Sequence, residues 1–164
     1  MKNFEQFIGI DWSGAKSPIH TQSIALAACE HGDNVPVLIR NSWSRKKVFE
    51  YIQSLEVRTL IGIDANFGYS ERIGVQQFGN TYTYKDLWAA VENKSKKNDN
   101  FFAGGYWECY PQFFWTHGKM PEHMKFPKRQ TEITCSANGY GNPESPFKLI
   151  GAKQVGKGGL SAMR

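Results

Sequence analysis

Two short apolar runs in this chain each end in an aspartate. The first run is Phe7-Ile8-Gly9-Ile10-Asp11, and the second is Thr59-Leu60-Ile61-Gly62-Ile63-Asp64. An apolar run of this length predicts a buried strand, and an acid placed where the run stops lies at the exposed carboxyl end of that strand. If the two strands are neighbours in one sheet, the carboxylates of Asp11 and Asp64 point into the same crevice.

Two carboxylates held a few Å apart repel each other unless a cation neutralises them. The pair therefore predicts a divalent-metal site made for phosphate chemistry. An aspartate after a strand is also a common turn former or helix N-cap, and this second interpretation is open. The near-identical local sequences Gly-Ile-Asp-Trp and Gly-Ile-Asp-Ala favour the metal site.

The segment after Asp11, residues 12–16, has the sequence Trp-Ser-Gly-Ala-Lys. Small residues and a glycine are expected where the backbone approaches a ligand closely. We take Ser13 and Lys16 as candidate substrate contacts.

Residues 4–64 are predicted to form strand, strand, strand, helix and strand. Apolar runs at 23–29 and 35–40 flank a Gly-Asp-Asn turn, which predicts that the first three strands form an antiparallel meander. A helix capped by Ser42 or Ser44 follows. Its apolar side is predicted to carry Val48, Phe49, Ile52 and Leu55, and its solvent side Arg45, Lys46, Lys47 and Glu50. A right-handed crossover then places the fourth strand parallel to the first and beside it. The fold class is α/β with a mixed sheet.

Beyond residue 65 the pattern predicts a helix near 84–97, because Thr83 followed by Asp86 is typical of an N-cap. Residues 101–117 are densely aromatic, which favours core packing over stacking on bases. Residues 118–146 are rich in Pro, Gly and Asn and are predicted to be irregular. We define 98–146 as an aromatic and loop-rich insertion.

The chain has 164 residues with 40% hydrophobic and 14% aromatic content, which predicts one ordinary domain, 1–164. Its net charge of +5 comes from the second half, since residues 1–82 hold eight basic and eight acidic side chains, and 83–164 hold twelve and seven. The second half is therefore the better candidate for contact with a polyanion, although such a charge is also common in proteins that bind no nucleic acid.

No apolar stretch approaches a membrane span or a secretory signal, so we expect a cytoplasmic protein with no membrane partner. The three cysteines, Cys29, Cys109 and Cys135, are widely spaced and are expected to be reduced thiols. The spacing of Cys109, His117, His123 and Cys135 is irregular and does not favour a zinc site.

This layout, with an acid on the first and fourth strands, resembles the ribonuclease-H-like fold. More specifically, the chain is similar to a family of uncharacterised bacterial proteins described as predicted ribonuclease-H-like nucleases. The matching segments are 9–16 (Gly-Ile-Asp-Trp-Ser-Gly-Ala-Lys), 63–69 (Ile-Asp-Ala-Asn-Phe-Gly-Tyr), 129–132 (Arg-Gln-Thr-Glu) and 145–156, extended by 158–160 and 163–164.

The resemblance implies metal-dependent hydrolysis of phosphodiester bonds in nucleic acid, with Asp11 and Asp64 as ligands of Mg²⁺ or Mn²⁺. Glu132 is the first candidate for a further catalytic acid and Glu71 the second. The alternative for Glu132 is a surface ion pair with Arg129 or Lys128.

Three basic residues, Arg129, Lys148 and Lys153, are candidate substrate contacts. The two lysines lie among glycines, and the alternative is that they belong to a flexible connector.

Members of this family continue beyond the Met-Arg pair with another strand that ends in an acid. We therefore expect this chain to be an N-terminal portion whose metal site lacks one carboxylate, with Glu108 as a reserve ligand. The sheet edge exposed by such a truncation would allow self-association. Two other functions are open: a phosphate-binding ATPase-like half-domain, and a non-catalytic nucleic-acid-binding module.

Overall fold

The computed structural model describes residues 3–16, 23–120, 128–151 and 154–164. The chain divides into two compact units, Met1–Ala65 and Asn66–Arg164. Each unit has a hydrophobic cluster of its own. Within the described ranges, no helix combines the length and the apolar character needed to span a bilayer.

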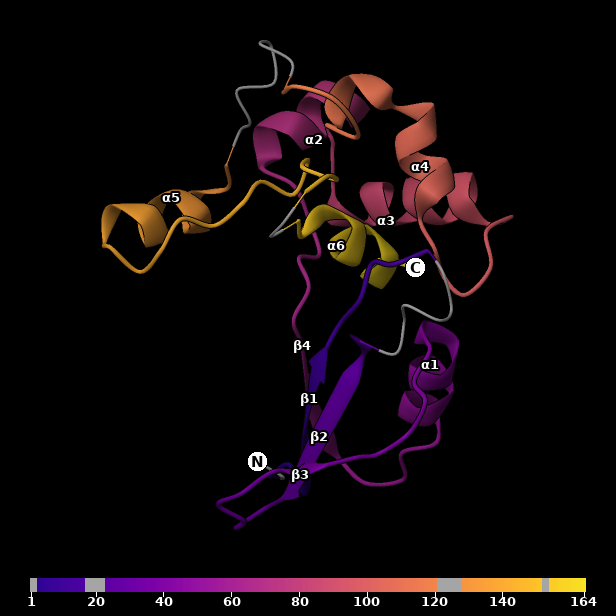
Figure 1. The fold of residues 1–164 in the computed structure, drawn as a ribbon, viewed down its shortest axis with the longest axis vertical. Coiled ribbons are helices and arrows are strands. Elements are labelled where there is room, and N and C mark those ends of the chain that lie inside the picture. Colours follow the sequence, from indigo (N-terminus) through magenta and orange to yellow (C-terminus); the bar gives the residue numbers. More distant parts are fainter. Residues whose placement is uncertain (1–2, 17–22, 121–127, 152–153) are drawn as a thin grey trace. The chain divides into compact units, whose positions relative to one another are not determined.

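The first unit is built on a mixed sheet whose described strands are ordered β3-β2-β1-β4 (Figure 1). Its elements are β1 (Gln6–Asp11), β2 (Ala25–Glu30), β3 (Val37–Leu38), α1 (Arg45–Gln53) and β4 (Thr59–Ile63). β2 is antiparallel to both β1 and β3, whereas β4 is parallel to β1. The predicted meander and the parallel pairing of the two aspartate-bearing strands are confirmed. β3 is shorter than the predicted 35–40, and Pro36, which lacks an N–H for the ladder, directly precedes it.

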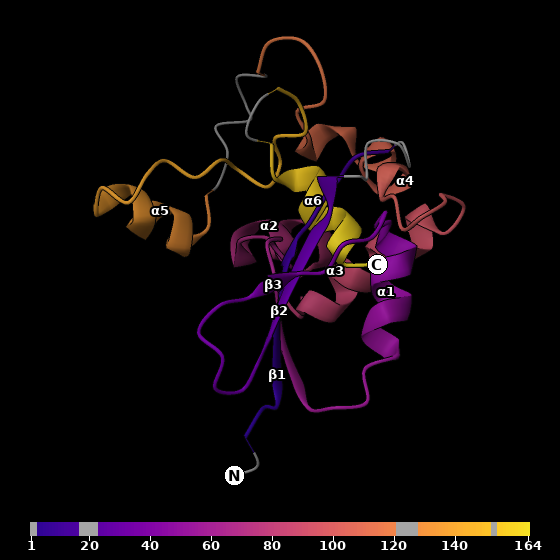
Figure 2. The ribbon, with the colours of Figure 1, turned by 60° about the horizontal axis from the view of Figure 1, so that its bottom comes forward.

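One face of this sheet is covered by α1. Side chains alternate along a strand, so Ile8 and Ile10 of β1 share a face, where each is 3% exposed. They pack in one cluster with Leu26 of β2 and Val48 of α1. Two views show α1 running beside the strands (Figure 1, Figure 2). The opposite face of β1 therefore carries Gly9 and Asp11.

The start of α1 confirms one prediction and contradicts two. Ser44 is the N-cap, and its Oγ accepts a hydrogen bond from the Lys47 N–H at 3.2 Å. Phe49, predicted on the apolar side, is 47% exposed, whereas Arg45, predicted on the solvent side, is 0% exposed. Burial of Arg45 is possible because backbone carbonyls accept hydrogen bonds from its guanidinium, which offsets part of the desolvation cost.

The regular elements described in the second unit are helices, apart from an isolated β-bridge between Trp115 and Lys148. Its elements are α2 (Glu71–Phe78), α3 (Tyr84–Ser95), α4 (Gly104–Cys109), the 3-10 helix η2 (Pro111–Phe113), α5 (Gln130–Ala137) and α6 (Gly156–Ala162). α3 confirms the helix predicted near 84–97. The prediction of irregular structure across 118–146 is wrong at α5. That helix begins with the Glu132 carboxylate accepting the Arg129 N–H at 2.7 Å, a local capping contact that outweighs the surrounding Pro and Gly content.

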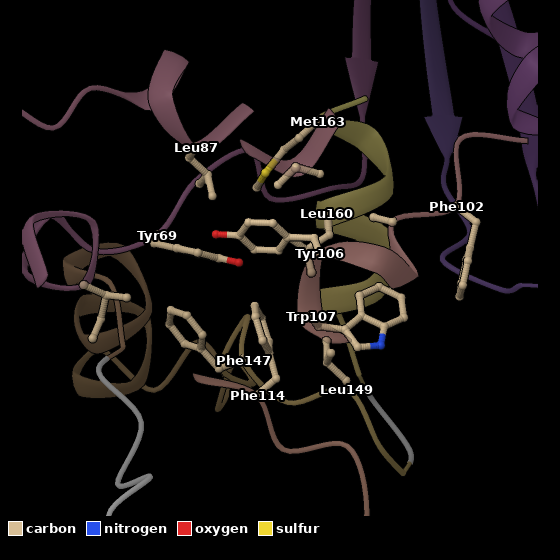
Figure 3. Packing of buried hydrophobic residues seen from close by; sticks show 13 residues of the cluster. Tyr69, Leu87, Phe102, Tyr106, Trp107, Phe114, Phe147, Leu149, Leu160 and Met163 are labelled. Atoms are coloured by element: carbon tan, nitrogen blue, oxygen red, sulfur yellow. The ribbon is translucent and has the colours of Figure 1, made fainter. Parts of the chain in front are cut away.

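The core of the second unit confirms that the aromatic run is a packing element. Phe102, Tyr106, Trp107 and Phe114 are all buried, and they belong to one cluster with Leu87, Leu160 and Met163 of other segments (Figure 3). The Tyr106 hydroxyl donates to Gln77 Oε1 at 3.0 Å. Burial raises the pKa of the Tyr106 phenol well above its ordinary value, so this hydroxyl stays protonated and serves as a structural donor.

Candidate functional site

The two aspartates lie side by side at the carboxyl ends of β1 and β4. These parallel strands pair in register from Gln6 with Thr59 to Ile10 with Ile63, and the Asp64 N–H donates to the Ile10 carbonyl at 2.9 Å. Asp11 and Asp64 are the next residues of the two strands. Adjacent strands are separated by about 4.8 Å, so the two side chains start from neighbouring positions.

Both carboxylates belong to the sheet face opposite α1. Ile10 is buried against α1, and the residue after it on a strand points the other way. Both Asp11 and Asp64 are exposed. The two acids predicted from the apolar runs thus lie exposed on one face of the sheet, at adjacent register positions.

The surface that leads to these acids is made of small side chains. Gly9 pairs with Ala27 on one side and with Gly62 on the other, which puts three small residues in one row across three strands. A Cβ atom built on Gly9 would meet nothing within 4 Å, so the sheet surface there is open. The row leaves room for an approaching ligand backbone next to Asp11.

Arg45 holds the loop after Asp11 through hydrogen bonds to its backbone. One guanidinium nitrogen, Nη1, donates to the Ser13 carbonyl at 2.7 Å and to the Ala15 carbonyl at 2.9 Å. The Ser13 hydroxyl oxygen accepts the Ala15 N–H at 3.3 Å. These contacts fix the segment that contains Ser13, one of the predicted substrate contacts, whereas Lys16 at its end is exposed.

Arg45 is the residue that the sequence reasoning missed. One signal could have found it: the first turn of α1 contains no acid and begins with Arg-Lys-Lys. Positive charge at a helix N-terminus opposes the helix dipole, so a basic first turn is locally unfavourable. No acid in the first turn of α1 compensates for this positive charge, which indicates a tertiary or functional role for one of the basic residues.

The donor set of the aspartate pair fits a hard divalent cation. Carboxylate oxygens suit Mg²⁺ and Mn²⁺, and Mg²⁺ is commonly bound through one or two carboxylates, with water and substrate phosphate filling its other positions. Among the described residues, no group of three or more His, Cys, Asp or Glu side chains is placed to hold a metal ion. The pair offers two carboxylates, and the described residues place no third His, Cys, Asp or Glu side chain with them.

Glu132, the predicted third acid, lies in the second unit and is engaged by Arg129. It is 4% exposed, and its Oε1 accepts from Arg129 Nε at 2.8 Å and lies 2.7 Å from Arg129 Nη2. The ion pair with Arg129 was the alternative interpretation of Glu132, although the Glu132 carboxylate is buried and not at the surface. The roles of Glu132 as a catalytic acid and of Arg129 as a substrate contact stay predictions.

The other candidate residues are distributed over the second unit. Lys148 Nζ forms a 2.9 Å ion pair with Glu144 and lies 5.8 Å from the centre of the Trp115 ring. Lys153 lies outside the described residues. Glu71 begins α2 and Glu108 lies near the end of α4, and both are exposed.

The three cysteines are free thiols, as predicted. His123, one member of the disfavoured zinc set, lies outside the described residues.

Comparison of the chain with protein-family models, with curated proteins and with solved structures finds no match. The fold established for the described residues is α/β, with a four-stranded mixed sheet in the first unit.

Proposed function

We propose that this chain carries the aspartate pair of a divalent-metal-dependent, ribonuclease-H-like phosphodiester hydrolase acting on nucleic acid. The observation that supports the proposal is the in-register placement of Asp11 and Asp64 on the exposed face of adjacent parallel strands. The expected cofactor is Mg²⁺ or Mn²⁺, and the expected location is the cytoplasm.

In this proposal Asp11 and Asp64 hold the ion, which would supply Lewis-acid stabilisation of a phosphoryl oxygen and lower the pKa of a bound water. Ser13 and Lys16 contact the substrate beside the pair. The hydroxyl of Ser13 already accepts one hydrogen bond from the Ala15 N–H, and its own proton can be donated to a phosphate oxygen. Arg129, Lys148 and Lys153 contribute positive charge from the more basic part of the chain.

The test is calorimetric titration of Mn²⁺ and Mg²⁺ into chelator-treated wild type, Asp11→Asn and Asp64→Asn. Glu56→Gln is the matched control, because Glu56 is an exposed acid of the same unit and the change removes the same charge. We expect saturable binding in the wild type and in Glu56→Gln. In each aspartate variant we expect affinity at least about tenfold lower, since one of two charged ligands is lost.

Cleavage of RNA and DNA oligonucleotides with Mn²⁺ follows with the same four proteins. Cleavage by the wild type that is abolished in both aspartate variants, while their circular dichroism is unchanged, supports the hydrolase. Metal binding that is equal in wild type and variants contradicts it. Salt-sensitive nucleic-acid binding that a chelator does not change would instead favour the binding module, and tight ATP binding would favour the ATPase-like half-domain.

A further inference from the structure

We propose that the loop formed by residues 12–16 is a phosphate-binding loop and that Arg45 is its positioning residue. The proposal rests on the proposed function in taking the phosphate to be a phosphodiester of nucleic acid. It adds a group that acts without a metal ion, namely the main chain at Gly14. It also gives the buried arginine a role that its contacts support.

Arg45 reaches the loop from the start of α1. It is the first residue of α1, directly after the Ser44 cap, and its side chain is completely buried. From there its guanidinium reaches 32 residues back along the chain to the Ser13 carbonyl at 2.7 Å, and also contacts the Ala15 carbonyl at 2.9 Å. A charged donor shared by two carbonyls of one loop fixes the orientation of both peptide planes.

Peptide geometry fixes the direction of the Gly14 N–H. A trans peptide is planar, so its N–H points opposite to its C=O. Because the Ser13 carbonyl points toward the buried guanidinium, the Gly14 N–H points away from it. The Ala15 N–H is used within the loop by the Ser13 hydroxyl oxygen. Among the described residues, the Gly14 N–H donates to no other group.

The charge and the donors of the loop suit an anion. The Gly14 N–H points away from the buried guanidinium, the Ser13 hydroxyl can donate its proton, and the cation of Arg45 contacts the same loop through two carbonyls. Phosphate is the anion expected beside the aspartate pair, because Asp11 and Asp64 would hold a Mg²⁺ ion, and its charge would favour a phosphate nearby. Arg45 acts through the loop and not by touching the ligand, so we describe it as a positioning residue.

The experiment titrates inorganic phosphate into chelator-treated, ¹⁵N-labelled protein and follows the backbone amide resonances. We expect a saturable shift centred on the Gly14 amide in the wild type. Arg45→Met should weaken the apparent affinity about tenfold through loss of the charge-assisted hydrogen bonds. Arg40→Met is the matched control, because Arg40 is exposed in the same unit and the change removes the same charge.

Two further arms separate positioning from a merely structural role. Millimolar guanidinium added to Arg45→Ala should restore part of the Gly14 shift by occupying the vacated site. Asp11→Asn should bind phosphate at least as well as the wild type, because it removes a nearby negative charge. Metal binding by Asp11→Asn that equals that of the wild type would thus overturn the proposed function and leave the phosphate loop intact.

The proposal is supported by a Gly14 shift whose apparent affinity falls about tenfold in Arg45→Met and is unchanged in Arg40→Met, and which guanidinium partly restores in Arg45→Ala. Tighter competition by a single-stranded oligonucleotide than by ATP identifies the source as nucleic acid, and the reverse order identifies a nucleotide. Phosphate shifts that spread over exposed lysines without saturation at Gly14, or equal affinity in Arg45→Met and wild type, overturn it. If Arg45→Met does not fold, the absence of a phosphate-induced shift at the Gly14 amide of the wild type also overturns the proposal.

Discussion

Replacing Asp64 by Asn should stabilise the metal-free protein and reduce its stabilisation by metal. Asp11 and Asp64 occupy neighbouring register positions on one exposed face of parallel strands. Side chains placed this way bring their carboxylates to within about 5–6 Å. At that distance, two unit charges in water repel by about 0.8 kcal/mol, and the water value applies because both groups are exposed. Asp64→Asn removes this repulsion.

Metal reverses the order of stability. A ligand that binds only the folded state at 100 times its Kd adds about 2.7 kcal/mol to the free energy of unfolding. At the Mn²⁺ concentration that gives the wild type this amount, Asp64→Asn, whose affinity is at least about tenfold lower, gains at most about 1.4 kcal/mol. We therefore expect the variant to be more stable by about 0.8 kcal/mol in chelator, and the wild type to be more stable by at least about 0.5 kcal/mol in Mn²⁺.

The measurement is urea unfolding at low ionic strength, in chelator and in Mn²⁺, followed by circular dichroism. Low ionic strength matters because physiological salt screens much of a repulsion acting over this distance. Glu56→Gln controls for the loss of one negative charge from an exposed side chain before the start of β4, at the opposite end of that strand from Asp64. If Asp64→Asn is no more stable than Glu56→Gln in chelator, or gains as much stability in Mn²⁺ as the wild type, the pairing of the two carboxylates is refuted.

Three further predictions concern the scaffold. The pKa of the Asp86 carboxyl is lowered from 3.8 by hydrogen bonds from Thr83, so its contribution to stability is present above pH 3.8 and is lost as pH falls through the lowered pKa; urea midpoints of wild type and Asp86→Asn should differ at neutral pH and converge in acid. Ser44→Ala removes the cap of α1 and should cost about 1 kcal/mol in chemical denaturation. Gly105→Ala places a methyl group against a backbone carbonyl of α3 and should cost about 1–3 kcal/mol, whereas Gly9→Ala, at an open position, should change thermal stability little; equal effects would contradict this packing.

The strand pattern of the first unit was predictable because it rests on local sequence. A run of Ile, Leu and Gly that stops at an acid fixes both a strand and its carboxyl end, and the handedness of the crossover fixes which strands are neighbours. The aspartate pair follows from these two rules alone. β3 could not be bounded in the same way, because a proline within an apolar run shortens the hydrogen-bonded ladder without changing its hydropathy.

The second unit was less predictable because its contacts are long-range. The aromatic run was correctly predicted as core, but its partners, such as Phe147 and Met163, come from segments with weak patterns of their own. α5 was missed since its start depends on one side chain that reaches back to a backbone N–H. Arg129 is the partner of the Glu132 carboxylate in this contact. Glu132 was proposed as the third acid from the family resemblance, and the spacing of residues alone could not show that it has a structural partner.

Arg45 shows where pattern reasoning and burial diverge. Hydropathy assigns a charged residue to the solvent side of a helix, and for Lys46, which is exposed and lies 3.9 Å from Glu50, that assignment holds. It fails for Arg45 because the acceptors that permit its burial are main-chain carbonyls 30 and 32 residues away, which carry no residue-type signal. The sequence feature that indicates such a contact is the basic first turn of α1, which is unfavourable for the helix dipole. Two features can thus be sought together in a sequence: a basic first turn of a helix, which opposes the helix dipole, and a loop that directly follows an acid at the end of a strand. Where both occur, a contact between the basic side chain and the loop explains the unfavourable charge.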